Sequence, residues 1–302
     1  MSKKIVIGIG EILWDVFGEE KRLGGAPANF AHHASQTGAE GVAVSAVGDD
    51  ALGDAIFAEL AGKTLRAEFQ RVSGVPTGTV AVSLDASGSA RYAFPSDSAW
   101  DHLAFTEHLR DLAARADAVC FGTLMQRSET SRETVRAFLR ATPENALRVF
   151  DANLRADFYS EKLVRESLAL ANVLKINEDE LRVLGGFFGV PAGDAFAARR
   201  DRFFETVFAA FPCLRFVVLT CGGDGSFIAA RDGEFSFVAA DAGTRVVDTV
   251  GAGDSFTATF TTALLAGRPL AEAHRLAADV SAFVCSRAGA MPELPDALKA
   301  RL

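Results

Sequence analysis

Hydrophobic residues along the chain form short runs that alternate with longer amphipathic stretches. The short runs are bounded by Gly, Asp or Asn and cover residues 4–10, 41–47, 117–122, 147–151, 172–177 and 215–220. Helical periodicity lies between most of them, for example over residues 128–141, 161–170 and 195–208. This alternation predicts a mostly parallel β-sheet covered by helices on both faces. Functional residues of such a sheet are expected at the carboxyl ends of its strands.

One segment departs from this alternation. Residues 79–94 alternate between apolar and polar positions around a turn at Asp85 to Gly88, which predicts an antiparallel hairpin. Together with residues 12–23 the hairpin forms either a small β-lid outside the main sheet or an edge of that sheet. The chain shows no repeats or long linkers, so we expect residues 1–302 to form one domain with lid segments at about 12–23 and 79–94.

Composition excludes several classes of function. The chain is 49% hydrophobic and 23% charged, with a formal net charge of -8, which is typical of a globular protein. This acidity argues against a nucleic-acid or anionic-membrane partner, which would need clustered Lys and Arg. Glu11 interrupts the first apolar run too early for a signal peptide or a membrane span, which predicts a cytoplasmic protein. The four cysteines lack metal-binding spacing and are expected in the core.

The most informative stretch is Asp248-Thr-Val-Gly-Ala-Gly-Asp254-Ser-Phe256. Its residues Gly251, Ala252 and Gly253 permit a tight turn whose backbone amides converge on an oxygen anion at the start of a helix. Asp254 falls in the first helical turn, where its carboxylate can take a proton from a hydroxyl aimed at a bound phosphorus atom. An ordinary helix start is the structural alternative.

A second glycine-rich stretch lies near the N-terminus, at residues 24–31. Gly24 and Gly25 end an extended segment and allow a ligand hydroxyl to approach the backbone closely. Pro27 suits the first turn of a helix that runs to Thr37, and Asn29 in that helix can donate to and accept from neighbouring hydroxyls. This chemistry suits a polyol, and the alternative is again a solvated helix start.

These two motifs resemble those of the ribokinase-like (PfkB) family of sugar and nucleoside kinases, in the order and separation that the family shows. The segments GEILWDVF, RLGGAPANFA and FDANLR are similar to bacterial fructokinases in particular. The resemblance implies a ribokinase-like three-layer α/β/α sandwich with a mostly parallel central sheet and a small β-lid. It also implies ATP and Mg²⁺ as cofactors.

The resemblance assigns roles to further residues. Asp15 is expected to bind sugar hydroxyls, with Trp100 nearby, and Arg155 either faces a polar ligand group or pairs with Asp151. Glu11 is left out of the predicted site because it fits a structural role equally well.

The phosphate side of the site is expected after two other strands. Asn177 and Glu180 match a pattern that organises magnesium through water, although Asn and Glu at this spacing also form a capping box. Thr220, Gly222 and Gly225 are expected to contact ATP, although such a glycine cluster also suits an ordinary turn. The resemblance further implies a monovalent cation such as K⁺, at Asp248, Val250, Cys285, Ala288 and Ala290.

The sequence therefore predicts an ATP-dependent sugar kinase, a fructokinase that phosphorylates the C6 hydroxyl with Asp254 as general base. Gly25, Asn29 and Asp15 are expected to orient the sugar. The alternatives are a kinase for another ketose, a sugar acid or a nucleoside, and a sugar-binding regulator without catalysis. A homodimer is compatible with the sequence, which does not determine the oligomeric state.

Overall fold

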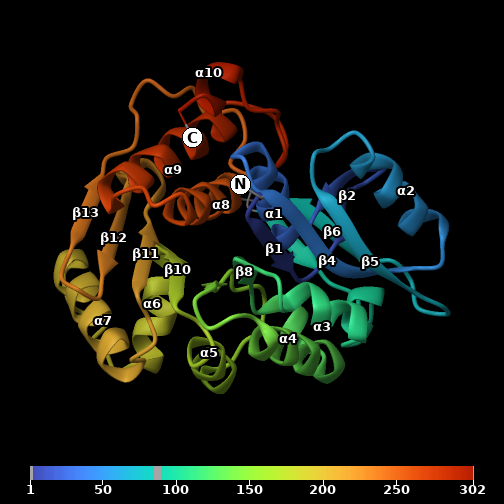
Figure 1. Cartoon of the computed structure of the whole chain (residues 1–302), viewed down its shortest axis with the longest axis horizontal. Helices are drawn as coiled ribbons and strands as arrows, with labels where there is room; N and C mark the ends of the chain where they lie inside the picture. The colour runs from blue at the N-terminus through green and yellow to red at the C-terminus, as the bar shows by residue number, and fades with distance from the viewer. Residues whose placement is uncertain (1–2, 85–89, 302) are drawn as a thin grey trace.

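The central element is a nine-stranded sheet in the computed structural model, which describes residues 3–84 and 90–301 (Figure 1). Neighbouring strands are parallel except at one edge, where β12 and β13 are antiparallel. In spatial order the strands are β13 (Phe235–Val238), β12 (Ser226–Ala230), β11 (Phe216–Thr220), β10 (Val173–Asn177), β9 (Leu147–Asp151), β8 (Ala118–Phe121), β1 (Ile5–Ile9), β4 (Glu40–Gly48) and β5 (Arg66–Val72).

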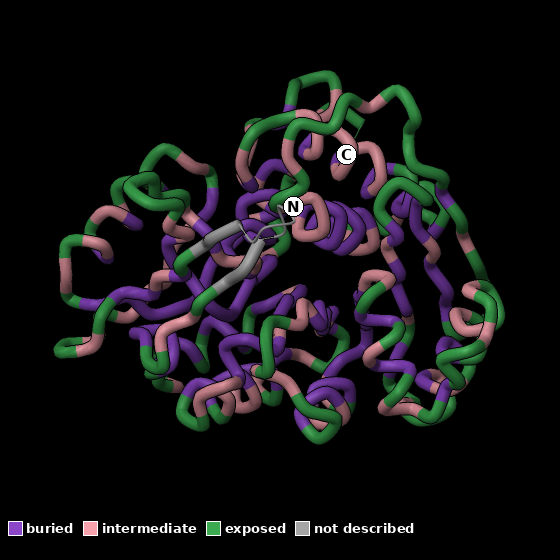
Figure 2. Tube along the Cα trace, turned by 180° about the vertical axis from the view of Figure 1, so that it is seen from behind, coloured by how far each residue is buried: buried purple, intermediate pink, exposed green. Residues whose placement is uncertain are grey.

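Two layers of helices cover this sheet because its strands are apolar on both faces. Along β1, Val6 packs into the cluster that contains Phe30 and Phe260, whereas Ile7 packs on the opposite side with Phe138. The first layer comprises α1 (Ala26–Gln36), α8 (Ala252–Leu265) and α9 (Leu270–Cys285). The second layer comprises α3 (Glu107–Ala113), α4 (Glu129–Ala141), α5 (Glu161–Leu168), α6 (Glu178–Phe187) and α7 (Phe196–Ala210). Figure 2 shows the strands buried between these layers, with most exposed residues in the outer helices and loops.

A second sheet of four strands lies beside the first. Its order is β3 (Glu20–Gly24), β2 (Leu13–Phe17), β6 (Thr79–Leu84) and β7 (Ala90–Ala93). It contains both predicted lid segments, and β6 pairs with β7 as an antiparallel hairpin. The two segments therefore form a sheet of their own and not an edge of the main sheet, and their action as a lid stays a prediction. The predicted turn at Asp85 to Gly88 lies outside the described residues.

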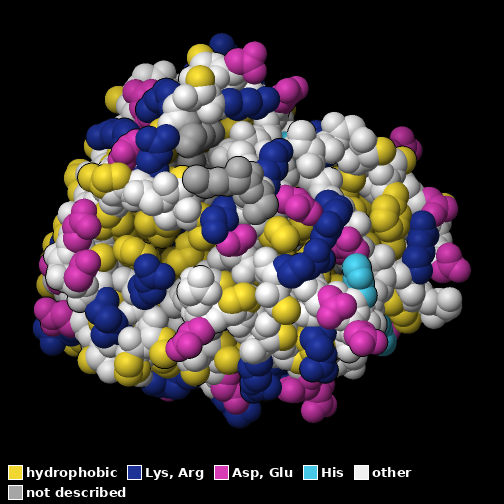
Figure 3. All heavy atoms as spheres, viewed as in Figure 1, with side chains coloured by type: hydrophobic (Ala, Val, Ile, Leu, Met, Phe, Trp, Pro, Cys, Tyr) yellow, Lys and Arg dark blue, Asp and Glu magenta, His cyan; other side chains and the backbone are white. Residues whose placement is uncertain are grey.

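The remaining helices are short or peripheral. They are α2 (Ala51–Leu60), α10 (Asp296–Lys299) and the 3₁₀ turns η1 (Ala99–His102), η2 (Leu124–Arg127) and η3 (Gly222–Asp224). Within the described residues we find no helix long and apolar enough to cross a bilayer. On the face shown in Figure 3, cationic and anionic side chains are interspersed.

Most predicted elements begin and end within two residues of the observed ones, but α8 begins earlier. The apolar run that signals this helix in the sequence begins only at Phe256, whereas the helix itself begins at Ala252. Gly251 caps it with φ of 78°, and the Ser255 amide donates to the Gly251 carbonyl at 2.8 Å. The predicted turn is therefore the first turn of the helix itself, and Asp254 lies inside it as expected.

Close packing of α1 on β1 fixes the position of the N-terminal helix. A Cβ atom at Gly8 would lie 2.0 Å from the Pro27 carbonyl oxygen, far inside contact distance. We therefore expect Gly8→Ala to lower the free energy of unfolding by about 1–3 kcal/mol or more, because β1 and α1 must separate. Gly62→Ala is the control, since a Cβ there meets nothing within 4 Å. Urea unfolding measures both, and equal effects of the two substitutions would contradict this packing.

Candidate active site

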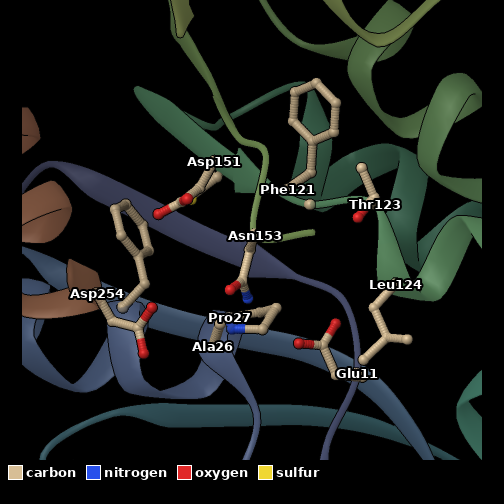
Figure 4. Close-up of a pocket in the computed structure, with 12 residues that line it drawn as sticks. Glu11, Ala26, Pro27, Phe121, Thr123, Leu124, Asp151, Asn153 and Asp254 are labelled. Carbon is tan, nitrogen blue, oxygen red and sulfur yellow. The ribbon is translucent and has the colours of Figure 1, made fainter. Parts of the chain in front are cut away.

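A pocket opens at the carboxyl ends of β1, β8 and β9, against the N-terminal turns of α1 and α8 (Figure 4). It brings together five separate segments of the sequence. The residues that line it are Glu11, Ala26, Pro27, Phe30, Cys120, Phe121, Gly122, Thr123, Leu124, Asp151, Asn153 and Asp254. Its place agrees with the general rule for sheets of this kind.

Asp254 is the residue around which the pocket is organised. The Asn29 side-chain amide donates to its Oδ2 atom at 2.8 Å, which joins α1 to α8. Surrounding protein and the negative charge of Asp151 raise the pKa of Asp254 to about 6, although Asn29, Lys175 and Arg155 act in the opposite direction. A carboxylate with this pKa is a stronger base than an ordinary aspartate and is still ionised at neutral pH.

Asn29 has a second, unused hydrogen-bonding atom. Its Oδ1 atom is buried and has no partner among the described residues, and the residue as a whole is only 4% exposed. A buried acceptor without a partner is unfavourable, and a ligand hydroxyl would satisfy it. The structure thus brings Asn29 and Asp254 together, as a hydroxyl-binding site requires.

The glycine turn differs in detail from the expectation. Only Gly251 adopts a positive φ, and a Cβ there would lie 2.5 Å from the Ala290 carbonyl oxygen. Gly253 lies within α8, and a Cβ there would meet the Lys175 Nζ atom at 3.0 Å. The Ala252 amide donates to the Thr249 carbonyl at 3.2 Å, so an anion would have to compete for this amide. The first-turn amides without intrahelical partners are those that remain to bind it.

Lys175 and Asp151 form a buried ion pair beneath this turn. The Lys175 Nζ atom lies 3.1 Å from Asp151 Oδ1, and the Thr257 hydroxyl donates to Asp151 Oδ2 at 3.2 Å. Burial disfavours the Lys175 ammonium, but Asp151, Glu180 and Asp254 outweigh it and raise its pKa. Sequence reasoning missed Lys175, although a lysine inside the apolar run of β10 was a visible signal.

Arg155 does not pair with Asp151, so that alternative is wrong. Asp151 is paired with Lys175, whereas Arg155 is exposed and its side chain donates to the Leu154 carbonyl at 3.1 Å. Its positive charge acts on the carboxyl groups of Glu11, Asp15 and Asp254. In each case it partly offsets the rise in pKa that burial causes. The residue therefore supplies a cation beside the acidic pocket.

Glu11 also belongs to this site, contrary to its omission in the sequence analysis. It is 5% exposed and lines the pocket together with Asp254. Burial raises the pKa of Glu11 to about 7, with a further contribution from Asp254, while backbone amides of Glu11 and Ala26 and the charge of Arg155 lower it. Asn153, which also lines the pocket, has a positive φ of 39°, a backbone conformation that asparagine adopts more readily than most other non-glycine residues.

The other predicted sugar-binding residues lie beside the pocket and do not line it. Asp15 is on β2, and its Oδ2 atom would be 2.5 Å from a Cβ at Gly24. Gly25 has φ of 127° and approaches the Glu11 carbonyl. Burial raises the pKa of Asp15 against the effect of Arg155. Both glycines are thus required by contacts within the chain, in addition to any approach of a ligand.

Trp100 lies in the core. It is 1% exposed, and the Arg127 guanidinium stacks 4.0 Å from its ring centroid. The ring is not among the residues that line the pocket, and its place near the sugar stays a prediction.

Asn177 and Glu180 form the capping box that their spacing predicts. The Asn177 Oδ1 atom accepts from the Glu180 amide at 2.9 Å, and Glu180 Oε2 accepts from the Asn177 amide at 2.8 Å. Glu180 Oε1 accepts from the Leu154 amide at 2.9 Å, so both carboxyl oxygens already have backbone donors. Burial raises the pKa of Glu180 against the opposing charge of Lys175. No cluster of three or more metal-binding side chains occurs in residues 3–84 and 90–301.

The predicted nucleotide-binding residues follow the neighbouring strand. Thr220 ends β11 and lies in register with Asn177 at the end of β10. Gly222 is exposed, with φ of 52°. Gly225 has φ of 100°, and a Cβ atom there would lie 2.2 Å from the Val238 carbonyl oxygen. The structure therefore brings Thr220, Gly222 and Gly225 to the same edge as Asn177.

Three of the residues predicted to hold a monovalent cation, Asp248, Val250 and Cys285, are hydrogen-bonded to one another. The Asp248 carboxylate accepts from the amides of Val250 and Gly289, both at 3.0 Å. The Cys285 carbonyl accepts from two amides, and the Ala290 carbonyl lies 2.9 Å from the His33 Nε2 atom. Ala288 is exposed. These contacts hold the segment before α8 against the segment after α9.

Comparison with known proteins identifies relatives along nearly the whole chain. The model of the pfkB family of carbohydrate kinases matches residues 9–297. A fructokinase from Klebsiella pneumoniae is 31% identical and aligns over 98% of this chain and 97% of its own length. An ATP-dependent 6-phosphofructokinase from Thermoanaerobacterium thermosaccharolyticum is 26% identical over 98% of this chain and 92% of its own.

A solved structure confirms the predicted ribokinase-like fold. The structure of ribokinase from Giardia lamblia superposes with a TM-score of 0.78, covers all of both chains and is 23% identical. At this identity the likeness concerns the fold alone. The family resemblance noted in the sequence is confirmed by the family match.

The raised pKa of Asp254 predicts a measurable effect on stability. Because the folded-state pKa is above the ordinary value of 3.8, ionisation destabilises the folded protein as pH rises from there to about 6, and the cost is constant above that. Asp254→Asn removes this cost. We expect the variant to gain up to about 3 kcal/mol in the free energy of unfolding at pH 8 relative to wild type, and progressively less below pH 6.

Urea unfolding between pH 5 and 8 measures this difference. Asp232→Asn is the matched control, because Asp232 is exposed and its carboxylate accepts from the Glu234 amide, which asparagine can also do. A pH-independent difference for Asp254→Asn, or a loss of stability at pH 8, would show that the carboxyl is not destabilised by burial.

Proposed function

The chain belongs to the pfkB family of carbohydrate kinases, and we propose that it transfers the γ-phosphoryl group of ATP to the C6 hydroxyl of fructose. One observation carries this proposal most directly. The Asp254 carboxylate is held by Asn29 at 2.8 Å, in a pocket and one residue beyond a helix-start glycine turn. This arrangement places a base beside a site that suits an anion.

In the proposed reaction the sugar hydroxyl oxygen forms a bond to the γ-phosphorus, and the bond from that phosphorus to the β–γ bridging oxygen breaks. Asp254 takes the hydroxyl proton, and ADP leaves with the bridging oxygen. Asn29 donates to Asp254 and offers its free Oδ1 atom to a neighbouring hydroxyl, which orients the sugar.

Charge on the transferred group is stabilised at the start of α8. The first-turn amides of the helix and its dipole face an incoming anion. The Lys175 ammonium lies behind Gly253, 3.0 Å from where a Cβ would stand, and adds a fixed positive charge to the turn. Lys175 thus supports both the anion turn and the ionised form of Asp254, whereas Asp151 holds Lys175 in place but opposes that ionised form.

ATP is proposed as donor because a relative along 98% of the chain is an ATP-dependent kinase. Thr220, Gly222 and Gly225 would contact the nucleotide. Asn177 and Glu180 would hold Mg²⁺ through water, which fits a pair whose oxygens already accept backbone bonds. The ion would neutralise charge on the phosphates. A K⁺ ion at the segment that begins at Asp248 would add positive charge beside the glycine turn at the start of α8.

Substrate choice depends on the charges around the pocket. Glu11, Asp254 and Asp15 suit the hydroxyls of a neutral ketose, and the Klebsiella relative is a fructokinase. The exposed Arg155 favours a second candidate, a sugar acid or a sugar phosphate, because this cation is not paired with Asp151. A catalytically inactive regulator would not need the Asp254 arrangement.

We propose that segments 12–23 and 79–94 of the single domain close over the bound sugar.

A coupled assay of ADP release tests the reaction and its substrate together. The acceptor panel contains fructose, fructose 6-phosphate, ribose, glucose, adenosine and 2-keto-3-deoxygluconate. We expect fructose to give the highest kcat/KM. Arg155→Met should leave kcat/KM for fructose within about threefold, since the charge of Arg155 is not needed for a neutral sugar.

Two outcomes would contradict this assignment in different ways. If an anionic acceptor is preferred and Arg155→Met lowers its kcat/KM by about tenfold or more, the kinase proposal stands and the substrate proposal fails. If no acceptor in the panel raises the rate of ADP release above the rate measured without acceptor, the kinase proposal for these acceptors fails.

A further inference from the structure

A second buried acid faces the pocket in addition to Asp254. Glu11 lies two residues beyond the end of β1 and is 5% exposed. Figure 4 shows its carboxyl group pointing into the pocket from the side opposite Asp254, with Pro27 and Asn153 between them. Two carboxyl groups that a bound ligand would contact from opposite sides are therefore enclosed in one site.

Glu11 has no cation in contact with it. The ion pairs of residues 3–84 and 90–301 do not include Glu11, and the nearest positive charge that acts on it is that of the exposed Arg155. Its stabilising contacts are the backbone amides of Glu11 and Ala26. Of the other ionisable groups in the pocket, Asp151 is committed to Lys175, and burial keeps the Cys120 thiol neutral by raising its pKa.

Two carboxylates in one enclosed pocket repel each other, so a single proton is retained near neutral pH. The contacts decide which group keeps it. Asp254 receives a hydrogen bond from the Asn29 amide and lies near the Lys175 ammonium, so its ionised form is the better stabilised. Glu11 lacks both partners and keeps the proton. A protonated carboxyl group, unlike a carboxylate, can donate a hydrogen bond.

Resting on the proposed function, we infer that Glu11 contacts the acceptor sugar and, in its protonated form, donates a hydrogen bond to one of the sugar's oxygen atoms. The pocket would then offer Glu11 as donor and Asp254 as acceptor, and Asn29, which donates to Asp254, has its Oδ1 atom free as a second acceptor beside the pocket. Loss of the Glu11 proton removes the donor and places a second negative charge in the pocket. Sugar binding must therefore weaken as pH rises through the titration of Glu11, which the pKa of about 7 places within a measurable range.

The experiment measures fructose binding by calorimetry without nucleotide, from pH 6.5 to 8.5, for wild type, Glu11→Gln and Glu11→Ala. Glutamine keeps a donor at all pH values, so we expect its Kd to stay within about threefold of wild type at pH 6.5 and to be independent of pH. The wild-type Kd should rise with pH. At pH values above the pKa of Glu11 the increase should approach tenfold per pH unit. Glu11→Ala should bind about tenfold or more weakly at pH 6.5.

Thermal unfolding of each variant separates this role from a purely structural one. If Glu11 only caps α1 through the Ala26 amide, alanine and glutamine would lower stability without introducing or removing a pH dependence of Kd. A wild-type Kd that is flat from pH 6.5 to 8.5, or a glutamine variant that follows the wild-type pH profile, would overturn the inference. If Glu11→Ala does not fold, the comparison of wild type with Glu11→Gln decides alone.

The same measurements distinguish this inference from the function on which it rests. Wild-type protein that binds and phosphorylates fructose with a pH-independent Kd would contradict the role of Glu11 only. Wild-type protein that binds no sugar of the acceptor panel would contradict the proposed function and this inference with it.

Discussion

The enclosure of the Asp254 carboxyl is the physical constraint on which the site depends. Burial alone would drive this group to its neutral form, in which it could not act as a base. The Asn29 amide and the Lys175 ammonium oppose burial, whereas Asp151 adds to it, and the pKa settles at about 6. Lys175 can serve in this way because Asp151, Glu180 and Asp254 together keep it charged in the interior. The ionised state of Asp254 therefore depends on Asn29 and Lys175, and the charged state of Lys175 depends in turn on the carboxylates around it.

The fold supplies the accuracy that this network needs. Asn29 is on α1 and Asp254 is on α8, two helices separated by more than two hundred residues but packed side by side on the same face of the sheet. Gly8 allows α1 to approach β1 closely, and Gly251 allows the start of α8 to approach Ala290. Neither helix could shift by the width of a methyl group without moving the hydrogen bond between Asn29 and Asp254.

The sequence was sufficient to predict the parallel sheet, its two helical layers and the residues with strong local signals. Gly251, Asp254 and Asn29 belong to contiguous motifs whose spacing has a clear physical meaning. Lys175 and Asp151 were missed as a pair because their contact depends on the alignment of β9 and β10, which no local pattern states. Arg155 was given two roles for the same reason. Glu11 was set aside because a sequence does not show which way a buried carboxyl group points.

The most direct test of this account is a single-turnover measurement of phosphoryl transfer with Asp254→Asn, combined with calorimetric binding of the sugar. Asparagine can still accept the hydrogen bond from Asn29, so the account predicts that sugar binds within a few-fold of wild type. It predicts that the rate of transfer falls by about 10² to 10⁴-fold, because the base is lost. A transfer rate within a few-fold of wild type would contradict the assignment of Asp254 as the base and, with it, the proposed purpose of the buried network.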